Sequence, residues 1–221
     1  MTPRASASAD AARREARRSG AIFAILPVKR FDAAKQRLDH ELSGGTRRAL
    51  AEAMVTDVLT ALRRTEAVDA VLLVTAEPAA EAIGRGYGAR VLHDDQQAGQ
   101  SAATQIGLRH AIEAGATRAL LVPGDTPALD PAELGALLAR RPAGPADLVI
   151  VPDRHGTGTN ALLIAPPRAI IPSFGPGSLA RHEAAAVAAA RRLGATIASH
   201  DDTTEAQVAA SRAIGVAVAE F

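Results

Sequence analysis

Residues 152–160, PDRHGTGTN, combine chemical groups that neither a helix nor an ordinary strand favours. Their glycine and threonine residues, Thr159 among them, offer exposed backbone N–H groups and hydroxyls, the usual constituents of an anion-binding nest. Arg154 and His155 could contact an anion or simply cover the surface, and Asp153 is a candidate metal ligand or a turn residue. The segment therefore predicts an anion-binding loop, with a glycine-rich hairpin turn as the alternative.

A second segment of this kind, FGPGSLARH at residues 174–182, leads into an expected helix. Gly175 and Ser178 precede that helix, and Arg181 and His182 fall in its first turn. A helix N-terminus with a Ser hydroxyl and a nearby cation favours a phosphate or a carboxylate, and capping by Ser178 is compatible with that role. Two separate anion-binding loops suggest two anionic ligands.

Four cations follow an apolar segment within nine residues, namely Lys29, Arg30, Lys35 and Arg37. A loop with this charge can neutralise a triphosphate, although it could also be an ordinary solvated basic loop. The sequence lacks the GxxxxGK[ST] pattern of a P-loop. Because the cations come directly after an expected buried strand, we favour phosphate binding.

A carboxylate ends another apolar segment, in PGDTPAL at residues 123–129. Gly124 lets the backbone turn there, and Pro127 prevents further strand pairing. Asp125 is therefore well placed to hold Mg²⁺, a hard cation that takes oxygen ligands and is usually bound together with substrate phosphates. The alternative is a carboxylate that caps a helix or a turn.

Continuous apolar runs precede these polar segments, as expected for strands that are covered on both faces. The runs occupy residues 21–29, 70–75, 89–94, 118–125 and 146–153. Helical patterns lie between them at residues 46–65, 101–113 and 131–141. This alternation predicts βαβ units, a mostly parallel sheet and polar residues gathered at the carboxyl ends of its strands, where ligands bind in such sheets.

Further elements complete the expected fold. In the first helix, Leu50, Met54, Val58 and Leu62 form a stripe that should face the sheet. Residues 160–167 follow the quoted loop too closely for a helical crossover, so this strand is expected to be antiparallel or to lie elsewhere in the sheet. A helix near residues 178–193, a short strand ATIAS and a last helix from Thr203 follow. We expect one three-layer α/β domain over residues 20–221.

Composition excludes several classes of protein. Of the 221 residues, 48% are hydrophobic but only 2% aromatic, so the core must be aliphatic. A net charge of +1 argues against a general nucleic-acid binder, and no apolar run approaches the length of a membrane span. The sequence has no Cys, which excludes disulfides and fits a reducing cytoplasm. Residues 1–19, rich in Arg and Ala, are expected to form a disordered, solvated extension outside the fold.

The motifs LPVKRFDAAKQRL, GDTPAL, PDRHGTGTNALLI and FGPGSLARH occur in this order and spacing. Together they resemble the phosphoenolpyruvate or 2-phospho-L-lactate guanylyltransferases of coenzyme F-420 biosynthesis, essentially from residue 21 to residue 221. The resemblance implies a single-domain nucleotidyltransferase fold of the GT-A, Rossmann-like type. It also implies that GTP donates GMP to the phosphate of a three-carbon acid, with release of pyrophosphate.

The resemblance also assigns residues. It implies that Thr159, Gly175 and Ser178 bind the acceptor, and that Asp125 and the C-terminal Asp202 hold Mg²⁺. His200 stands where related sequences often have another acid. Where relatives often have Gly-Leu-Asn, this chain has AGQSAA, which leaves Gln100 and Ser101 as alternatives for a base or ribose contact.

The expected chemistry is charge neutralisation and positioning, without a strong general base, because the acceptor phosphate is already ionised. Lys29, Lys35 and Arg37 would shield the triphosphate, and Asp125 would hold the metal. Two alternatives remain. One is a sugar-phosphate or molybdopterin nucleotidyltransferase of the same fold, and the other is a non-catalytic regulator that binds a nucleotide.

Overall fold

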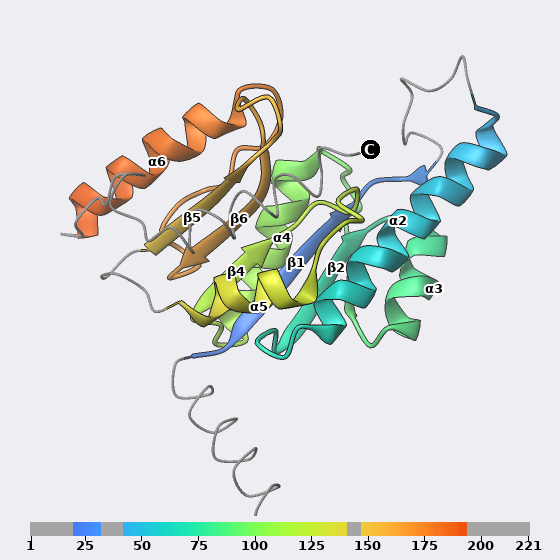
Figure 1. Cartoon of the computed structure of the whole chain (residues 1–221), viewed down its shortest axis with the longest axis horizontal. Helices are drawn as coiled ribbons and strands as arrows, with labels where there is room; N and C mark the ends of the chain where they lie inside the picture. The colour runs from blue at the N-terminus through green and yellow to red at the C-terminus, as the bar shows by residue number, and fades with distance from the viewer. Residues whose placement is uncertain (1–19, 32–41, 141–146, 194–221) are drawn as a thin grey trace, which may run out of the picture.

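A six-stranded mixed sheet forms the centre of the computed structural model, which describes residues 20–31, 42–140 and 147–193 (Figure 1). The strands are β1 (Ile22–Val28), β2 (Ala70–Thr75), β3 (Arg90–His93), β4 (Arg118–Leu121), β5 (Asp147–Pro152) and β6 (Thr159–Ala165). Their order across the sheet is β3-β2-β1-β4-β6-β5. Strands β1 to β4 are parallel, and β6 is antiparallel to both of its neighbours.

Five helices within the described ranges cover the two faces of this sheet. They are α2 (Gly44–Arg64), α3 (Pro78–Gly86), α4 (Gln100–Glu113), α5 (Pro131–Ala139) and α6 (Ser178–Leu193). Asp130 caps α5, because its carboxylate accepts the backbone N–H of Ala132 at 2.6 Å, with Pro131 in the first turn. None of these helices is long and apolar enough to cross a membrane.

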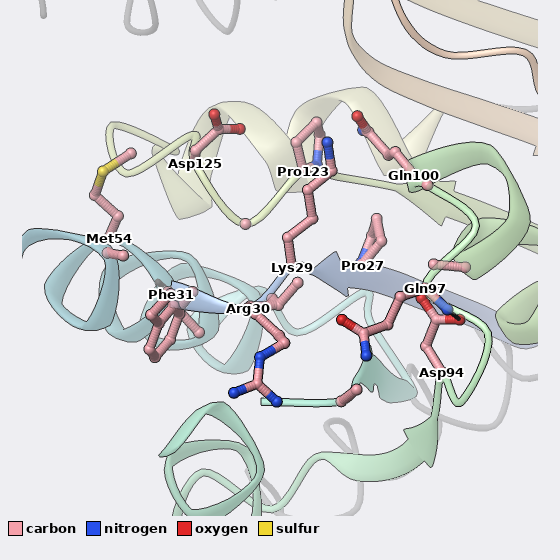
Figure 2. A pocket seen from close by; sticks show the side chains of 17 residues that line it. Pro27, Lys29, Arg30, Phe31, Met54, Asp94, Gln97, Gln100, Pro123 and Asp125 are labelled. Atoms are coloured by element: carbon pink, nitrogen blue, oxygen red, sulfur yellow. Dashed lines mark hydrogen bonds between the residues drawn. The ribbon is translucent and has the colours of Figure 1, made fainter. Parts of the chain in front are cut away.

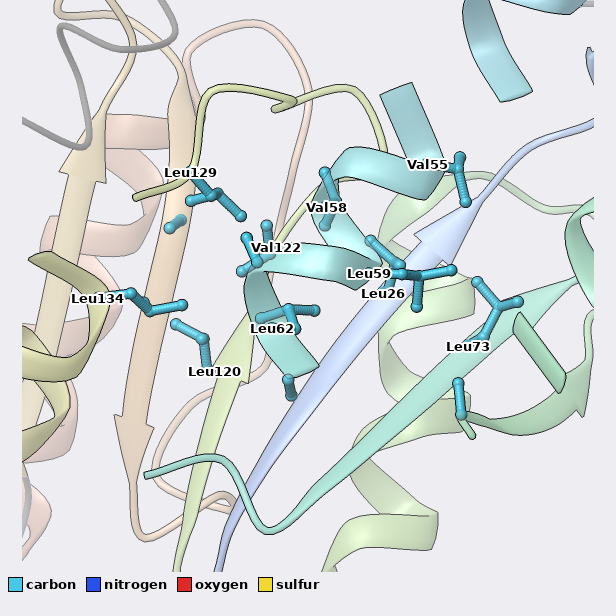
Figure 3. Close-up of a cluster of buried hydrophobic side chains, with 14 of the residues drawn as sticks. Leu26, Val55, Val58, Leu59, Leu62, Leu73, Leu120, Val122, Leu129 and Leu134 are labelled. Atoms are coloured by element: carbon cyan, nitrogen blue, oxygen red, sulfur yellow. The ribbon is translucent and has the colours of Figure 1, made fainter. Parts of the chain in front are cut away.

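Aliphatic side chains fill both spaces between the sheet and the helices. On β1, Leu26 belongs to the cluster that α2 and α5 cover, whereas Ile25 belongs to the cluster on the α4 and α6 face, and both are fully buried. Figure 3 shows the first cluster, in which Val58 and Leu62 of α2 approach the sheet. Burial on two faces explains why the strands read as continuous apolar runs.

Several expectations hold and others need correction. Residues 160–167 were expected to break the parallel pattern, and β6 does so. Strand β4 ends at Leu121 rather than at residue 125, and helix α3 was missed. On α2, the buried side extends to Val55 and Leu59, whereas Leu50 is only half-buried. The segment ATIAS, the helix after Thr203 and residues 1–19 lie outside the described residues.

The topology brings the polar segments to one edge of the sheet. Because β5 is antiparallel to β6, and β6 is antiparallel to β4, strand β5 runs in the same direction as β4. The loops that follow β1, β4 and β5 therefore all lie at the carboxyl edge of the parallel strands, where β6 also begins.

Candidate active site

A cavity of about 470 Å³ lies at the ends of β1 and β4. Its walls come from the segment after β1, the loop after β4, the start of α4 and one side of α2. Its polar lining residues are Lys29, Arg30, Asp94, Gln97, Gln100 and Asp125. The cavity thus brings cations, carboxylates and amides together, which is a composition suited to a polar, charged ligand.

Two of the predicted catalytic residues, Lys29 and Asp125, line this cavity. Figure 2 shows the Lys29 side chain extending toward Pro123, between Asp125 and Gln100 in that view, while Arg30 extends to the other side. Gly124 permits this arrangement, because a Cβ atom there would lie 2.9 Å from Val28 Cγ2. The loop after β4 can therefore pack closely against the end of β1.

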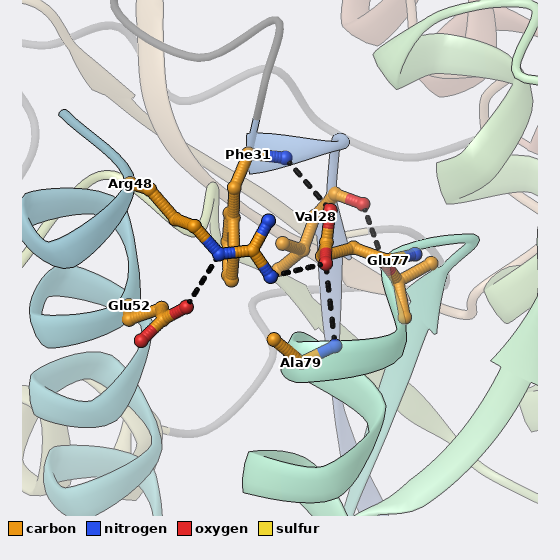
Figure 4. A network of polar contacts seen from close by, with 7 residues as sticks. Val28, Phe31, Arg48, Glu52, Glu77 and Ala79 are labelled. Carbon is orange, nitrogen blue, oxygen red and sulfur yellow. Dashed lines mark hydrogen bonds and ion pairs between the residues drawn. The ribbon is translucent and has the colours of Figure 1, made fainter. Parts of the chain in front are cut away.

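A buried carboxylate holds the segment that carries Lys29 and Arg30 (Figure 4). Glu77, which is 2% exposed and caps the N-terminus of α3, accepts the backbone N–H of Phe31 at 3.0 Å. Its other oxygen accepts Arg48 Nη2 at 3.1 Å, and Arg48 also lies over the Phe31 ring. The backbone after β1 is thus fixed by the residue that caps α3, just after the neighbouring strand β2.

The charge of Glu77 is itself stabilised. Burial alone would raise the pKa of Glu77, but hydrogen bonds from the backbone N–H groups of Phe31 and Ala79, together with the Arg48 guanidinium, hold its pKa below the ordinary range. No local pattern in the sequence marks this residue for such a role, because Phe31 and Arg48 lie 46 and 29 residues away along the chain.

The loop after β5 is built around Asp153. Its Oδ1 accepts the backbone N–H groups of His155 at 3.1 Å and Thr157 at 2.9 Å, and a Cβ at Gly158 would lie 2.6 Å from its Oδ2. Burial would raise the pKa of Asp153, but the hydrogen bonds from its own loop lower it. These contacts give Asp153 the role of turn residue, and metal binding by Asp153 stays a prediction.

A buried polar cluster lies at the start of β6 and α6. Thr159, Ser178 and His182 are 8%, 1% and 0% exposed. Thr159 Oγ1 lies 2.9 Å from His182 Nδ1 and accepts the Ser178 hydroxyl at 3.2 Å. Burial first, and then the charge of Arg181, lower the pKa of His182, so its ring is neutral near pH 7.

Hydrogen bonds from Arg181 hold the conformation of the loop before α6. Arg181 donates to the Ser173 hydroxyl at 2.8 Å and to the carbonyl of Pro176 at 2.7 Å, with further contacts to neighbouring carbonyls. Gly175 and Gly177 have φ values of +108° and +70°, which L side chains rarely adopt. The guanidinium of Arg181 therefore stabilises a tight turn at the helix start.

Two hydrogen bonds connect these loops to one another and to the cavity. The backbone N–H of Leu179 donates to the Thr157 carbonyl at 3.1 Å, which joins the loop after β5 to α6. The N–H of Phe174 donates to Ser101 Oγ at 2.9 Å, and Ser101 follows Gln100, which lines the cavity. The loop before α6 thus lies against α4, whose first turn forms one wall of the cavity.

The predicted site residues divide between these two places. Lys29 and Asp125 line the cavity, whereas the predicted acceptor residues belong to the loops around the buried cluster. Arg154 and His155 are exposed neighbours whose side chains are joined at 3.0 Å. Lys35, Arg37 and Asp202 lie outside the described residues.

A metal site of three or more acidic or histidine side chains does not occur within residues 20–31, 42–140 and 147–193. Asp125 lines the cavity at the edge where the cations gather. One carboxylate, completed by ligand phosphates and water, is the arrangement in which proteins commonly hold Mg²⁺. The residues therefore fit a magnesium ion that enters together with a nucleotide.

Comparison with solved structures supports the architecture. A nucleotide-diphospho-sugar transferase from Desulfovibrio desulfuricans aligns with a TM-score of 0.58 at 14% identity, covering 90% of this chain and 97% of that one. Glucosyl-3-phosphoglycerate synthase from Mycobacterium tuberculosis, in complex with Mg²⁺ and uridine diphosphate, aligns with a TM-score of 0.54 at 15% identity, covering 93% of this chain and 80% of that one. The fold is thus of the nucleotide-diphospho-sugar transferase type.

Sequence comparison is more specific. Phosphoenolpyruvate guanylyltransferase from Conexibacter woesei is 58% identical over 164 residues, which are 74% of each chain. The enzyme of the same name from Rubrobacter xylanophilus is 41% identical over 166 residues, covering 75% of this chain and 80% of the relative. The family model described as "Guanylyl transferase CofC like" matches residues 22–202, so this chain belongs to that family of nucleotidyltransferases.

Proposed function

We propose that this protein transfers GMP from GTP to the phosphate of phosphoenolpyruvate, or of 2-phospho-L-lactate, and releases pyrophosphate. In this proposal the reaction is a step of coenzyme F-420 biosynthesis and takes place in the cytoplasm. One observation carries most of the proposal: the start of α4 lines a cavity with cations and Asp125, and Ser101 of the same helix accepts the N–H of Phe174, in the loop that leads to a hydroxyl-rich cluster. Such an arrangement suits two anionic substrates that must meet.

The nucleotide would occupy the cavity. Lys29 would neutralise the triphosphate, and we assign the same role to Lys35 and Arg37 by their place in the motif. Asp94, which is 8% exposed and lines the cavity, supports the choice of guanine. Its Oδ1 accepts the N–H of Gln97 at 3.1 Å, and a carboxylate has further lone pairs for the N1–H and 2-amino groups of guanine.

Asp125 would hold Mg²⁺, with Asp202 and Asp153 as further proposed ligands. A divalent ion held there would supply positive charge that stabilises the pyrophosphate leaving group. The surrounding residues would place the α-phosphorus in line with the attacking oxygen. The acceptor phosphate is ionised near pH 7, so no residue has to remove a proton from it.

The acceptor would bind at the buried polar cluster that contains Thr159, Ser178 and His182. Thr159 and Ser178 supply hydroxyls there, and the turn at Gly175 leads to the N-terminus of α6, which favours an anion. We assign Arg154, His155 and Arg181 to the charged surroundings of the acceptor. Attack of the acceptor phosphate oxygen on the α-phosphorus forms the new P–O bond, and the bond to pyrophosphate breaks.

A pyrophosphate-release assay with purified protein tests the proposal. We expect release with GTP and phosphoenolpyruvate or 2-phospho-L-lactate, and little release with ATP or with either substrate alone. Release only with a sugar phosphate would favour a different nucleotidyltransferase. Binding of GTP without pyrophosphate release, whichever acceptor is added, would favour a regulatory protein and contradict the proposal.

A further inference from the structure

His182 makes a hydrogen bond with each nitrogen of its ring, although it is fully buried. Nε2 lies 2.9 Å from the backbone N–H of Ser173, and Nδ1 lies 2.9 Å from Thr159 Oγ1. A backbone N–H can only donate, so Nε2 must accept and carry no proton. In the neutral ring the proton is therefore on Nδ1, and Nδ1–H donates to the Thr159 hydroxyl.

This donation determines what Thr159 can do. Its oxygen accepts both Nδ1–H of His182 and the hydroxyl of Ser178, so both lone pairs are engaged. The Thr159 proton is then available only to an acceptor atom of a third group. An anionic oxygen of a carboxylate or phosphate is such an atom. With the opposite tautomer, Nδ1 would accept and the Thr159 proton would point toward the ring.

The same ring also supports the loop that contacts α4. Nε2 anchors the Ser173 N–H, and the next N–H, that of Phe174, donates to Ser101 Oγ at 2.9 Å. The rings of Phe174 and His182 meet edge to face, with centroids 5.1 Å apart. One imidazole thus determines both the polarity of a hydroxyl and the position of a loop.

We propose that His182 is a positioning residue of the acceptor site, held as the Nδ1–H tautomer so that Thr159 donates its proton to an anionic oxygen of the acceptor. It acts through Thr159 and does not touch the acceptor. The proposal rests on the proposed function only where it identifies the ligand of Thr159 as the acceptor.

The tautomer can be observed without any activity. Two-bond ¹H–¹⁵N correlation of the histidine rings in the full-length protein distinguishes a protonated Nδ1 from a protonated Nε2, and spectra of His182→Asn and His182→Gln assign the resonance. We expect a neutral, Nδ1-protonated ring at pH 7.5. A ring protonated on Nε2, or on both nitrogens, at that pH would overturn the inference whatever the enzyme does.

Two substitutions separate the two hydrogen bonds. In His182→Asn the amide NH₂ can replace Nδ1–H as the donor to Thr159, whereas in His182→Gln the amide oxygen can replace Nε2 as the acceptor from Ser173. We expect His182→Gln to raise the acceptor KM about tenfold over that of His182→Asn, the size of one lost hydrogen bond. The GTP KM should change by less than about twofold in both.

A double-mutant cycle shows whether His182 acts through Thr159. In a Thr159→Val background, His182→Gln should raise the acceptor KM no further. Equal effects of the Asn and Gln variants, or additive effects with Thr159→Val, would overturn the inference while leaving the proposed function intact. No turnover by the unaltered protein would instead count against the proposed function, and the ring spectrum would still test His182.

Discussion

Glu77 accepts the backbone N–H of Phe31 at 3.0 Å, so the carboxylate that caps α3, just after β2, fixes the backbone that follows β1. The contact spans 46 residues of sequence and is buried. Thr75 strengthens it, because its hydroxyl donates to the Val28 carbonyl at 2.8 Å and accepts the N–H of Glu77 at 3.0 Å. The position of Lys29, one residue after β1, depends on this network.

Replacing Glu77 with Gln should weaken nucleotide binding selectively. The amide keeps the size of the side chain but removes the charge that pairs with Arg48, so the loop after β1 should loosen. We expect the GTP KM to rise about fivefold or more, the size of about 1 kcal/mol. The acceptor KM should stay within about twofold. Steady-state kinetics with each substrate varied in turn provide the measurement.

Glu52→Gln is the matched control, because Glu52 pairs with the same guanidinium at 3.0 Å on the exposed side of α2. An exposed ion pair of this kind contributes about 0.5 kcal/mol or less. We expect neither the melting temperature nor the GTP KM to change appreciably. An equal effect of the two substitutions on the GTP KM would show that Arg48, and not the anchoring of Phe31, is what matters.

Asp125→Asn should lower turnover by about 10²-fold or more, because it removes a charge that would hold the metal at the transferred phosphate. Pyrophosphate release at saturating GTP and acceptor measures it, and circular dichroism confirms that the variant is folded. Asp57→Asn, on an exposed position of α2, is a control for the general loss of a carboxylate. Turnover near that of the unaltered protein would exclude the metal role of Asp125.

Much of the fold could be predicted because the parallel strands are buried on both faces. Ile25 and Leu26 point to opposite cores and both are fully buried, so β1 reads as an unbroken apolar run. Helix α3 was not predicted because it has only nine residues and contains Gly84 and Gly86, a residue type that usually indicates a turn. Gly84 is required by packing, since a Cβ atom there would collide with Leu73.

The only site residues that could be predicted from position are those that follow the end of a strand. Asp125 and Lys29 follow apolar runs, and the topology brings such positions to one edge. Glu77 was missed because its partner Phe31 is 46 residues away. The sequence places His182 in the first turn of the expected helix, but it gives no sign that Thr159 and Ser173 engage both ring nitrogens. Local patterns do not contain such pairings.

Asp94→Asn should weaken the preference for guanine. If the carboxylate accepts the N1–H and 2-amino groups of the base, its replacement by an amide should raise the GTP KM about tenfold or more. The effect should be smaller for inosine triphosphate, which lacks the 2-amino group. The neighbouring Asp95 is exposed, so Asp95→Asn should leave both KM values unchanged. Equal losses for GTP and inosine triphosphate in Asp94→Asn would mean that the carboxylate does not contact the 2-amino group.

Ser178→Ala should raise the acceptor KM more than the GTP KM. Ser178 is 1% exposed and donates to Thr159 Oγ1 at 3.2 Å, far along the chain from the residues that line the cavity. Losing this hydroxyl removes one of the two donors that hold Thr159. Kinetics at fixed, saturating GTP and then at fixed, saturating acceptor separate the two constants. Equal increases in both would remove Ser178 from the acceptor site.

The neutral ring of His182 should make folding stability depend on pH. Burial, and then the charge of Arg181, lower the pKa of His182, so the folded chain resists a proton that the unfolded chain binds below about pH 6.5. The free energy of unfolding should therefore fall as the pH drops through about 6.5. Urea unfolding at pH 7.5 and pH 5.5, compared with His182→Asn, isolates this contribution from the other histidines. The fall should be smaller in the variant, and an identical fall in both proteins would show that the folded chain accepts the proton at His182 without cost.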